Sequence, residues 1–509
     1  MSAGNKMVKA AGAIVIMNLL SRLLGFGREM AIADKFGVST AVDAYLVAYT
    51  IPYFLQAILG AALVTAVVPI FTEYLVEKRE KEAWMLVSNL LNISFAVLLL
   101  FTIMGVGFST LLVKLTAPGF NPEATELASS LTKIMFPSVI FMGVGMLLTG
   151  ILNAFHYFAL PAFAPGFSSL VIIIAVIVFG SKYGITGLAV GTLVSMLGFL
   201  IIQLPILRKL GFRYSFTFDY KHPDIKRIAA TIMPIVIGVA VNQIYFAINR
   251  VFASGLAEGS IAALNYAFRL MQLPLGIFVV AVSSVIFPTL SAQAIAKDYP
   301  KLKATLMRGL RLVTLIAIPA GVGLIVLAEP IVALLFERGA FDATATAMTA
   351  KALIFFSVGM FAQAANLVIT RAYYAVQDVR TPFIMSLISI IVNVVLSFIL
   401  IKPLTHGGLA LANSLAATVN TGLLYFYLTR HLEGLPHKQL GASLLKILIA
   451  SGVMAWFTLK IFTLVSGSLM IQVAIAILVG AFVYGGLIIL LREEETISII
   501  RQGLSRLKL

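Results

Sequence analysis

Fourteen long apolar segments constrain the fold of this chain more than any other feature. A helix of about 20 apolar residues spans the hydrocarbon core of a bilayer, where every backbone polar group must find its partner within the protein. We therefore predict an all-α polytopic membrane protein with about 14 transmembrane helices. The composition agrees, because 60% of the residues are hydrophobic and only 11% are charged. The segments lie near 9–36, 41–76, 84–113, 124–155, 158–181, 185–207, 228–255, 260–293, 306–336, 345–376, 381–402, 407–429, 441–465 and 468–491.

Lysine and arginine are distributed unevenly among the loops that join these segments. If the N-terminus is cytoplasmic, 25 of the 37 basic residues lie in inner loops and ends, and 6 lie in outer loops. This bias matches the positive-inside rule, so we predict that both termini are cytoplasmic. The first apolar segment lacks a small-residue cleavage site and is interpreted as an uncleaved span. The formal charge of +16 thus reflects topology, and we expect no nucleic-acid partner.

An internal repeat is visible at an offset of about 220 residues. VVPIFTEYL (Val67–Leu75) resembles VIFPTLSAQ (Val285–Gln293), and GLAVGTLVS (Gly187–Ser195) resembles GLALANSLA (Gly408–Ala416). Each repeat contains six spans, an even number, so the two repeats are parallel. We predict two six-helix lobes around a central cavity, followed by two extra helices. The predicted domains are an N-lobe (1–207), a cytoplasmic linker (208–227), a C-lobe (228–430) and a final segment with spans thirteen and fourteen and a cytoplasmic tail (431–509).

Six of the charged residues inside predicted spans mark a candidate substrate site. A charged side chain at the bilayer centre costs roughly 2.5–3.5 kcal/mol on insertion scales, so such residues usually face a partner or a hydrated cavity. Arginine suits phosphate because its planar guanidinium donates paired hydrogen bonds. Alternatives remain open: an arginine can extend to the interface, pair with Glu29, or form a structural ion pair with Asp43. The six residues are Arg22, Arg28, Glu29, Asp43, Arg250 and Arg269.

The sequence does not favour an enzyme. The five histidines lie in or beside loops, and none forms HExxH or a cluster with metal-ligand spacing. There is no P-loop, and the chain has no cysteine, which excludes thiolate chemistry. We expect no cofactor and no metal, and leave unassigned whether a monovalent cation or the membrane potential drives transport. A channel is a further alternative, although an arginine-lined cavity between two lobes suits alternating access better.

SRLLGFGREMAIADKFG (Ser21–Gly37), VDAYLVAYTIPYFLQ (Val42–Gln56) and YAFRLMQLPLGIF (Tyr266–Phe278) resemble the MurJ/MviN family of lipid II flippases. The resemblance covers essentially the whole chain. It implies fourteen helices, a central cavity and a groove at spans thirteen and fourteen for a lipid tail. It also implies a bacterial cytoplasmic-membrane flippase without covalent chemistry. Its substrate would be undecaprenyl-pyrophosphate-linked disaccharide-peptide, moved from the inner to the outer leaflet for peptidoglycan synthesis; protein partners are unknown.

The resemblance also implies site residues. The family's cavity arginines match Arg22, Arg28 and Arg269, its following acidic residue matches Glu29, and its span-two aspartate matches Asp43. One departure is Gln56, which stands where the family often has another arginine. We predict that Arg250 compensates for that missing charge; the alternative is that Arg250 reaches outer headgroups. The loss of the arginine keeps open a related lipid-linked oligosaccharide flippase of the O-antigen or capsule type, with a drug/cation antiporter less favoured.

Overall fold

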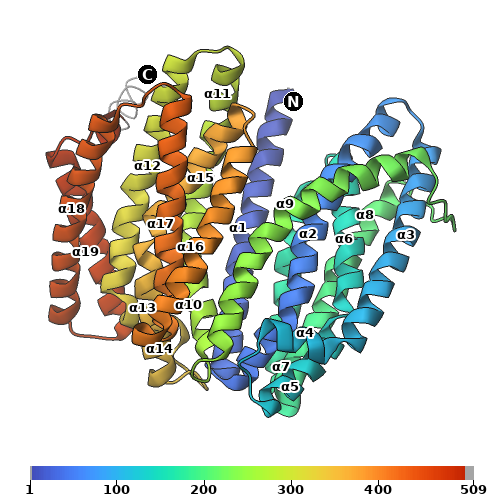
Figure 1. The fold of residues 1–509 in the computed structure, drawn as a ribbon, viewed down its shortest axis with the longest axis horizontal. Coiled ribbons are helices and arrows are strands. Elements are labelled where there is room, and N and C mark those ends of the chain that lie inside the picture. Colours follow the sequence, from blue (N-terminus) through green and yellow to red (C-terminus); the bar gives the residue numbers. More distant parts are fainter. Residues whose placement is uncertain (1–2, 499–509) are drawn as a thin grey trace. The chain divides into compact units, whose positions relative to one another are not determined.

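The computed structural model describes residues 3–498, with the side chains at 3–11, 61, 237, 241–242 and 244–245 left undescribed. In this range the chain is helical and contains no strand (Figure 1), which confirms the predicted all-α class. The helices are α1 (Ala3–Phe36), α2 (Thr40–Val76), α3 (Glu80–Gly107), α4 (Ser109–Thr116), α5 (Pro122–Met135), α6 (Ser138–Ala154), α7 (Ala159–Ile201), α8 (Leu204–Lys209), α9 (Pro223–Ser254), α10 (Ser260–Pro274), the π-helix η1 (Leu275–Val279), α11 (Val280–Ile295), α12 (Tyr299–Val326), α13 (Ala328–Phe336), α14 (Ala343–Val358), α15 (Met360–Ala375), α16 (Arg380–Leu404), α17 (His406–His431), α18 (His437–Leu464) and α19 (Leu469–Leu490).

The membrane-spanning segments agree with the predicted count of fourteen. Among the described residues, 9 helical segments are long and apolar enough to cross a membrane, and 11 if the bent pairs α5–α6 and α14–α15 each count as one span. The charged helices α1 and α9, with 34 and 32 residues, are also long enough. Helix α7 has 43 residues and is broken at Gly184, so it provides two spans. These segments are consistent with fourteen spans, and the exact count stays a prediction.

The backbone confirms the sequence repeat. Glycines with positive φ recur at equivalent places, Gly37 at 63° and Gly259 at 79°. Gly184 in α7 has φ 55° and ψ −142°, and Thr405 between α16 and α17 has φ 55° and ψ −135°. The bend between α5 and α6 is 42°, and that between α14 and α15 is 44°. At these positions the two repeats therefore have similar backbone conformations although their residues differ.

The described contacts divide the chain into two compact units. The first contains Met1–Ala262 with Arg338–Phe341, and the second contains Ala263–Glu337 with Asp342–Leu509. In the first unit α1 packs on α7 and α2 packs on both α6 and α9; in the second, α16 packs on α17 and α12 on α18. Helix α9 thus groups with the first unit, although it begins the second sequence repeat. The lobe boundaries derived from the repeat stay a prediction.

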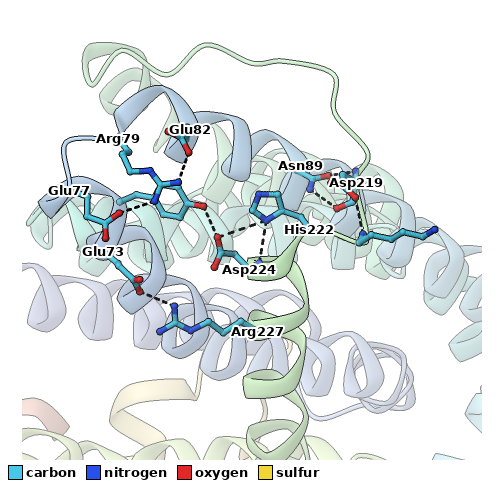
Figure 2. A network of polar contacts seen from close by, with 11 residues as sticks. Glu73, Glu77, Arg79, Glu82, Asn89, Asp219, His222, Asp224 and Arg227 are labelled. Atoms are coloured by element: carbon cyan, nitrogen blue, oxygen red, sulfur yellow. Dashed lines mark hydrogen bonds and ion pairs between the residues drawn. The ribbon is translucent and has the colours of Figure 1, made fainter.

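The segment between α8 and α9 is fastened to the first unit by polar contacts (Figure 2). Asp224, in the first turn of α9, accepts a hydrogen bond from the Tyr74 hydroxyl of α2 at 2.5 Å. One turn further, Arg227 forms an ion pair with Glu73 at 2.8 Å. Upstream, the Asn89 side chain of α3 exchanges two hydrogen bonds with the backbone of Asp219. The predicted linker is thus held against α2 and α3.

Candidate functional site

Helix α1 places two of the predicted site residues in a single ion pair. The Arg28 guanidinium donates to Glu29 Oε1 at 2.6 Å, with side-chain exposures of 21% and 7%. Removing one partner of a buried pair leaves an uncompensated charge, which is strongly destabilising. The pairing that the sequence left open as an alternative is therefore present. It neutralises Glu29 and leaves other Arg28 N–H groups for an incoming anion, because a guanidinium has five donors.

Arg22 lies on the same helix in a different environment. Its side chain is exposed, and no hydrogen bond or ion pair joins it to another described residue. The neighbouring Ser21 lies about 100° away around the helix and donates to the Ala162 carbonyl of α7 at 2.7 Å. The close approach of α1 to α7 at this point thus fixes the direction in which Arg22 leaves the helix, away from the packed interface.

Asp43 caps the start of a helix, and Arg250 also attracts its carboxylate electrostatically. Its carboxylate is 4% exposed and accepts the backbone N–H groups of Gly259 at 2.9 Å and Ala262 at 2.7 Å. These are N–H groups at the start of α10, where a helix has no internal acceptors and carries partial positive charge. Asp43 therefore fastens α2 to the turn between α9 and α10. Its contact with substrate stays a prediction.

Arg250 of α9 is directed toward α2. Its Nη1 donates to the Leu46 carbonyl, which also accepts the Thr50 hydroxyl within α2. The half-buried guanidinium thus contacts protein backbone here, whereas the alternative reading had it reach outer headgroups. Gln56 lies ten residues beyond Leu46, about 15 Å along a helix at 1.5 Å per residue. That Arg250 compensates for the missing arginine stays a prediction.

Gln56 lines a hollow of about 510 Å³ in the first unit. Its side-chain oxygen accepts a hydrogen bond from the Tyr49 hydroxyl at 3.4 Å. The α2 residues around the hollow recur at intervals of three or four and so share one helical face. The lining is mostly apolar, its polar side chains are Tyr53, Gln56 and Thr65, and none of the described lining residues is charged, which differs from the cationic lining predicted for a pyrophosphate. The lining residues are Tyr53, Gln56, Ala57, Gly60, Val64, Thr65 and Met146.

Arg269 belongs to the second unit, on α10. Tyr266 and Leu270 of the same helix are buried, whereas Arg269 and Gln272 are both exposed. Residues three apart lie on the same side of a helix, so these two form a polar strip on its exposed face. The predicted site residues are consequently brought together in part: Arg28 with Glu29, and Arg250 with α2 near Asp43. The units are described separately, so Arg269 is not placed against them.

The second unit also contains an apolar hollow of about 360 Å³. It lies where α12 and α13 meet α18 and α19, the region for which the family resemblance implies a lipid-tail groove. Small residues keep it open, among them Gly323 of α12 and Gly480 of α19. Its lining residues are Pro274, Ile316, Pro319, Ala320, Gly323, Leu324, Leu327, Ile331, Met454, Thr458, Ile477, Gly480, Ala481 and Tyr484.

Sequence reasoning missed several residues that the structure places at these sites. Tyr49 and Tyr53 precede Gln56 by seven and three residues, so their shared helical face with Gln56 was a readable signal. The capping role of Asp43 had no such signal, because it joins residues 216 and 219 positions apart. Within the described residues, no group of three or more His, Asp or Glu side chains could hold a metal ion.

The similarity to known proteins covers most of the chain. The model of the lipid II flippase MurJ family matches residues 32–480. A probable lipid II flippase MurJ of Buchnera aphidicola subsp. Acyrthosiphon pisum is 34% identical over 426 residues, 82% of this chain and 83% of that protein. The lipid II flippase MurJ of Burkholderia cenocepacia is 31% identical over 421 residues, 81% of this chain and 82% of that protein.

Solved structures agree with this match. A lipid II flippase MurJ in an inward closed conformation superposes with a TM-score of 0.81 at 30% identity, covering 94% of this chain and 99% of that one. An inward-facing multidrug resistance transporter of the MATE family gives a TM-score of 0.69 at 14% identity, covering 83% of this chain and 98% of that one. At that identity the second likeness concerns the fold alone.

Proposed function

The chain belongs to the MurJ family of lipid II flippases, and from this premise we propose that it moves lipid II from the inner to the outer leaflet of the bacterial cytoplasmic membrane by alternating access. It is a transporter and not an enzyme. The observation that carries the proposal is the family match over residues 32–480, which includes Asp43, Gln56, Arg250 and Arg269. Arg22, Arg28 and Glu29 precede the matched range.

The charged residues of α1 provide the chemistry for the pyrophosphate. Arg28 keeps its charge at any physiological pH and is held in place by Glu29 at 2.6 Å. Arg22 adds a second cation two turns earlier on an exposed face. In the proposal an incoming diphosphate accepts hydrogen bonds from both guanidinium groups, with Arg269 of the second unit as the third. Arg250 supports α2 in this scheme.

The apolar hollow beside α18 and α19 suits the polyprenyl tail. It is lined by aliphatic and small side chains, with Thr458 and Tyr484 as the polar exceptions. The Tyr484 hydroxyl is already used, since it donates to the Leu315 carbonyl at 2.8 Å. An isoprenoid therefore meets few groups that would lose hydrogen bonds on contact with it. The tail would stay in this groove while the headgroup crosses.

One observation favours a second candidate substrate. The hollow at Gln56 has no charged lining residue. Its polar side chains are Tyr53, Gln56 and Thr65, and these neutral hydrogen-bonding groups suit sugar hydroxyls better than peptide carboxylates. A related lipid-linked oligosaccharide of the O-antigen or capsule type is thus the alternative substrate, carried by the same machinery.

Complementation separates the two candidates. A bacterium depleted of its own lipid II flippase should regain growth when this chain is expressed, and Arg28→Ala at equal membrane abundance should not restore it. Failure of the unaltered chain, with insertion verified, would point to the oligosaccharide substrate.

The orientation is proposed with both termini cytoplasmic, on the strength of the charge bias. Cysteines placed in this cysteine-free chain at Lys182 or Arg338 should react with an impermeant thiol reagent from outside. Those at Lys221 or Lys303 should react only after the membrane is opened. The reverse labelling pattern would overturn the direction of transport.

A further inference from the structure

The linker between α8 and α9 alternates between polar and aromatic residues. From Tyr214 to Tyr220 the sequence is YSFTFDY, with an aromatic residue at every second position. The aromatic side chains are all exposed, at 58% for Tyr214, 84% for Phe216, 53% for Phe218 and 63% for Tyr220. In an extended chain alternate side chains point to opposite sides. The four rings, which we call the aromatic edge, therefore point to the other side of the linker from Ser215, Thr217 and Asp219.

The backbone at the polar positions is bound to α3. Ser215 N–H donates to the Ser88 hydroxyl at 3.2 Å, and the Thr217 carbonyl accepts from Asn92 Nδ2 at 2.8 Å. The Asn89 amide donates to the Asp219 carbonyl at 2.8 Å and accepts from its N–H at 2.7 Å, as a neighbouring strand would. The linker therefore turns the backbone of its polar positions toward α3. The four aromatic side chains stay exposed, and of these the Tyr214 hydroxyl also donates to Asn92 Oδ1 of α3 at 2.7 Å.

The aromatic edge continues a surface that faces lipid. Helix α3 begins with charged residues at Glu80, and apart from Met85 its exposed large apolar side chains run from Phe95 to Met104. Asn92, which holds Thr217, lies three residues before Phe95, about 4.5 Å along the helix at 1.5 Å per residue. The linker thus lies at the border between the charged end of α3 and its apolar face. Tyrosine and other aromatic residues are enriched at this level of a membrane.

The charges around the aromatic edge complement an anionic surface. Residues 208–227 contain six basic side chains against two acidic ones, Asp219 and Asp224. The Asp224 carboxylate is occupied by the Tyr74 hydroxyl, and one Asp219 carboxylate oxygen accepts the Lys221 N–H. The Lys221 ammonium lies 5.7 Å from the centre of the Tyr220 ring, so cation and ring face the same surroundings. Clustered basic residues beside a span bind anionic headgroups.

We propose that the aromatic edge of the linker is a membrane-binding surface, inserted among the anionic lipid headgroups on the linker side of the bilayer. The rings occupy the interfacial layer, and Arg213 and Lys221 contact lipid phosphates. This anchors the start of α9 to the bilayer as well as to α2 and α3. The proposal concerns the membrane alone and does not depend on which substrate is carried.

Spin-label depth measurements on the full chain in vesicles test this surface. Phe216→Cys, labelled and reconstituted in phosphatidylglycerol-containing vesicles, should collide more with dissolved oxygen than with an aqueous nickel chelate. The matched control is Lys301→Cys, whose side chain is 73% exposed in the first turn of α12 and forms an ion pair with Asp298. It should show the opposite preference. In the Phe216→Cys background, Arg213→Gln with Lys221→Gln should shift the label toward water, as should vesicles of phosphatidylcholine alone.

Two results would overturn the proposal. If the Phe216 label collides with nickel as readily as the Lys301 label, the aromatic edge faces water. If it is shielded from both reagents and its spectrum broadens with protein density, the edge binds a second copy of this chain. The label at Thr217, held against α3, checks folding, because it should be immobile in every background.

Discussion

Gly184 and Thr405 occupy the same position in the two repeats, with φ 55° in both, yet one is glycine and the other is β-branched. Nothing lies within 4 Å of where a Cβ at Gly184 would be. The Thr405 hydroxyl, in contrast, donates to the Leu404 carbonyl at 2.7 Å. Lys351 Nζ lies 3.4 Å from that hydroxyl and donates to it. The repeated topology requires a positive φ at this position. The first repeat places a glycine there, and the second places a threonine whose hydroxyl forms hydrogen bonds.

A second contrast concerns charge. Arg28 and Arg250 correspond at an offset of 222, the same as that between Gly37 and Gly259. Arg28 pairs with a carboxylate on its own helix, whereas Arg250 donates to a backbone carbonyl of α2. Equivalent positions thus carry the same side chain with different partners. The repeats preserve the scaffold, while the local partners decide what each arginine can do.

The largest expected effect separates those two arginines. Arg28→Ala should abolish complementation, because it removes a substrate cation and breaks the buried ion pair with Glu29. Arg250→Ala should lower activity less, since it removes a contact that supports α2. Gln56→Arg should not rescue Arg250→Ala, because about 15 Å of helix separates Gln56 from Leu46. Growth rescue at equal membrane abundance measures all three.

An equal loss for both arginines, with rescue by Gln56→Arg, would restore the compensation hypothesis drawn from the sequence. Arg28→Lys is the control for charge alone. It should retain part of the activity, because an ammonium keeps the charge and loses the paired donors.

The next effect concerns Asp43, whose counterpart in the second repeat is Asn265 at the same offset of 222. Asp43→Ala leaves the N–H groups of Gly259 and Ala262 without an acceptor, at a cost of about 1–3 kcal/mol. Asp43→Asn keeps one acceptor oxygen and should cost less. The melting temperature in detergent should fall in that order. Equal melting temperatures for Ala and Asn would mean that the charge, and not the cap, stabilises this end.

Gly184 and Thr405 give a smaller and opposite pair of effects. Gly184→Ala should destabilise by about 1–2 kcal/mol, because an L side chain disfavours positive φ even in open space. Thr405→Gly should change stability by less than about 1 kcal/mol, since the relief of backbone strain is offset by the lost hydroxyl contacts. Thermal unfolding of both variants measures the difference. A destabilising Thr405→Gly larger than Gly184→Ala would show that the hydroxyl contacts dominate.

The sequence predicted much of this fold, and the reason is physical. Apolar segments of bilayer length have one stable secondary structure in lipid, and the repeated motifs around Val67 and Val285 reported the two parallel halves. The site was predicted only by residue type. The hydrogen-bond partners of Asp43 could not be predicted, because they lie in a turn more than 200 residues away in the sequence. Likewise the sequence suggested that Arg250 replaces a charge at Gln56, whereas its contact with Leu46 depends on how α9 packs on α2.

The smallest expected effect is a pH dependence that comes from Asp378 in the second repeat. Asp378 precedes α16, and its counterpart at the offset of 221 is Tyr157, which carries no carboxylate. Burial alone would raise the pKa of Asp378, but hydrogen bonds from Thr381 and from the Arg380 backbone outweigh it and hold that pKa below its usual value. A lowered pKa means that the charged form is favoured in the folded state, so the stabilisation is complete above the ordinary aspartate pKa. It is lost as the pH falls below about 4 toward the folded value.

Asp378→Asn should remove this acid-sensitive part of the melting temperature and leave the value at neutral pH only slightly lower. The control is Tyr157→Phe, which should leave the acid dependence unchanged. If Asp378→Asn melts with the same acid dependence as the unaltered chain, other carboxylates control the stability of α16 at low pH.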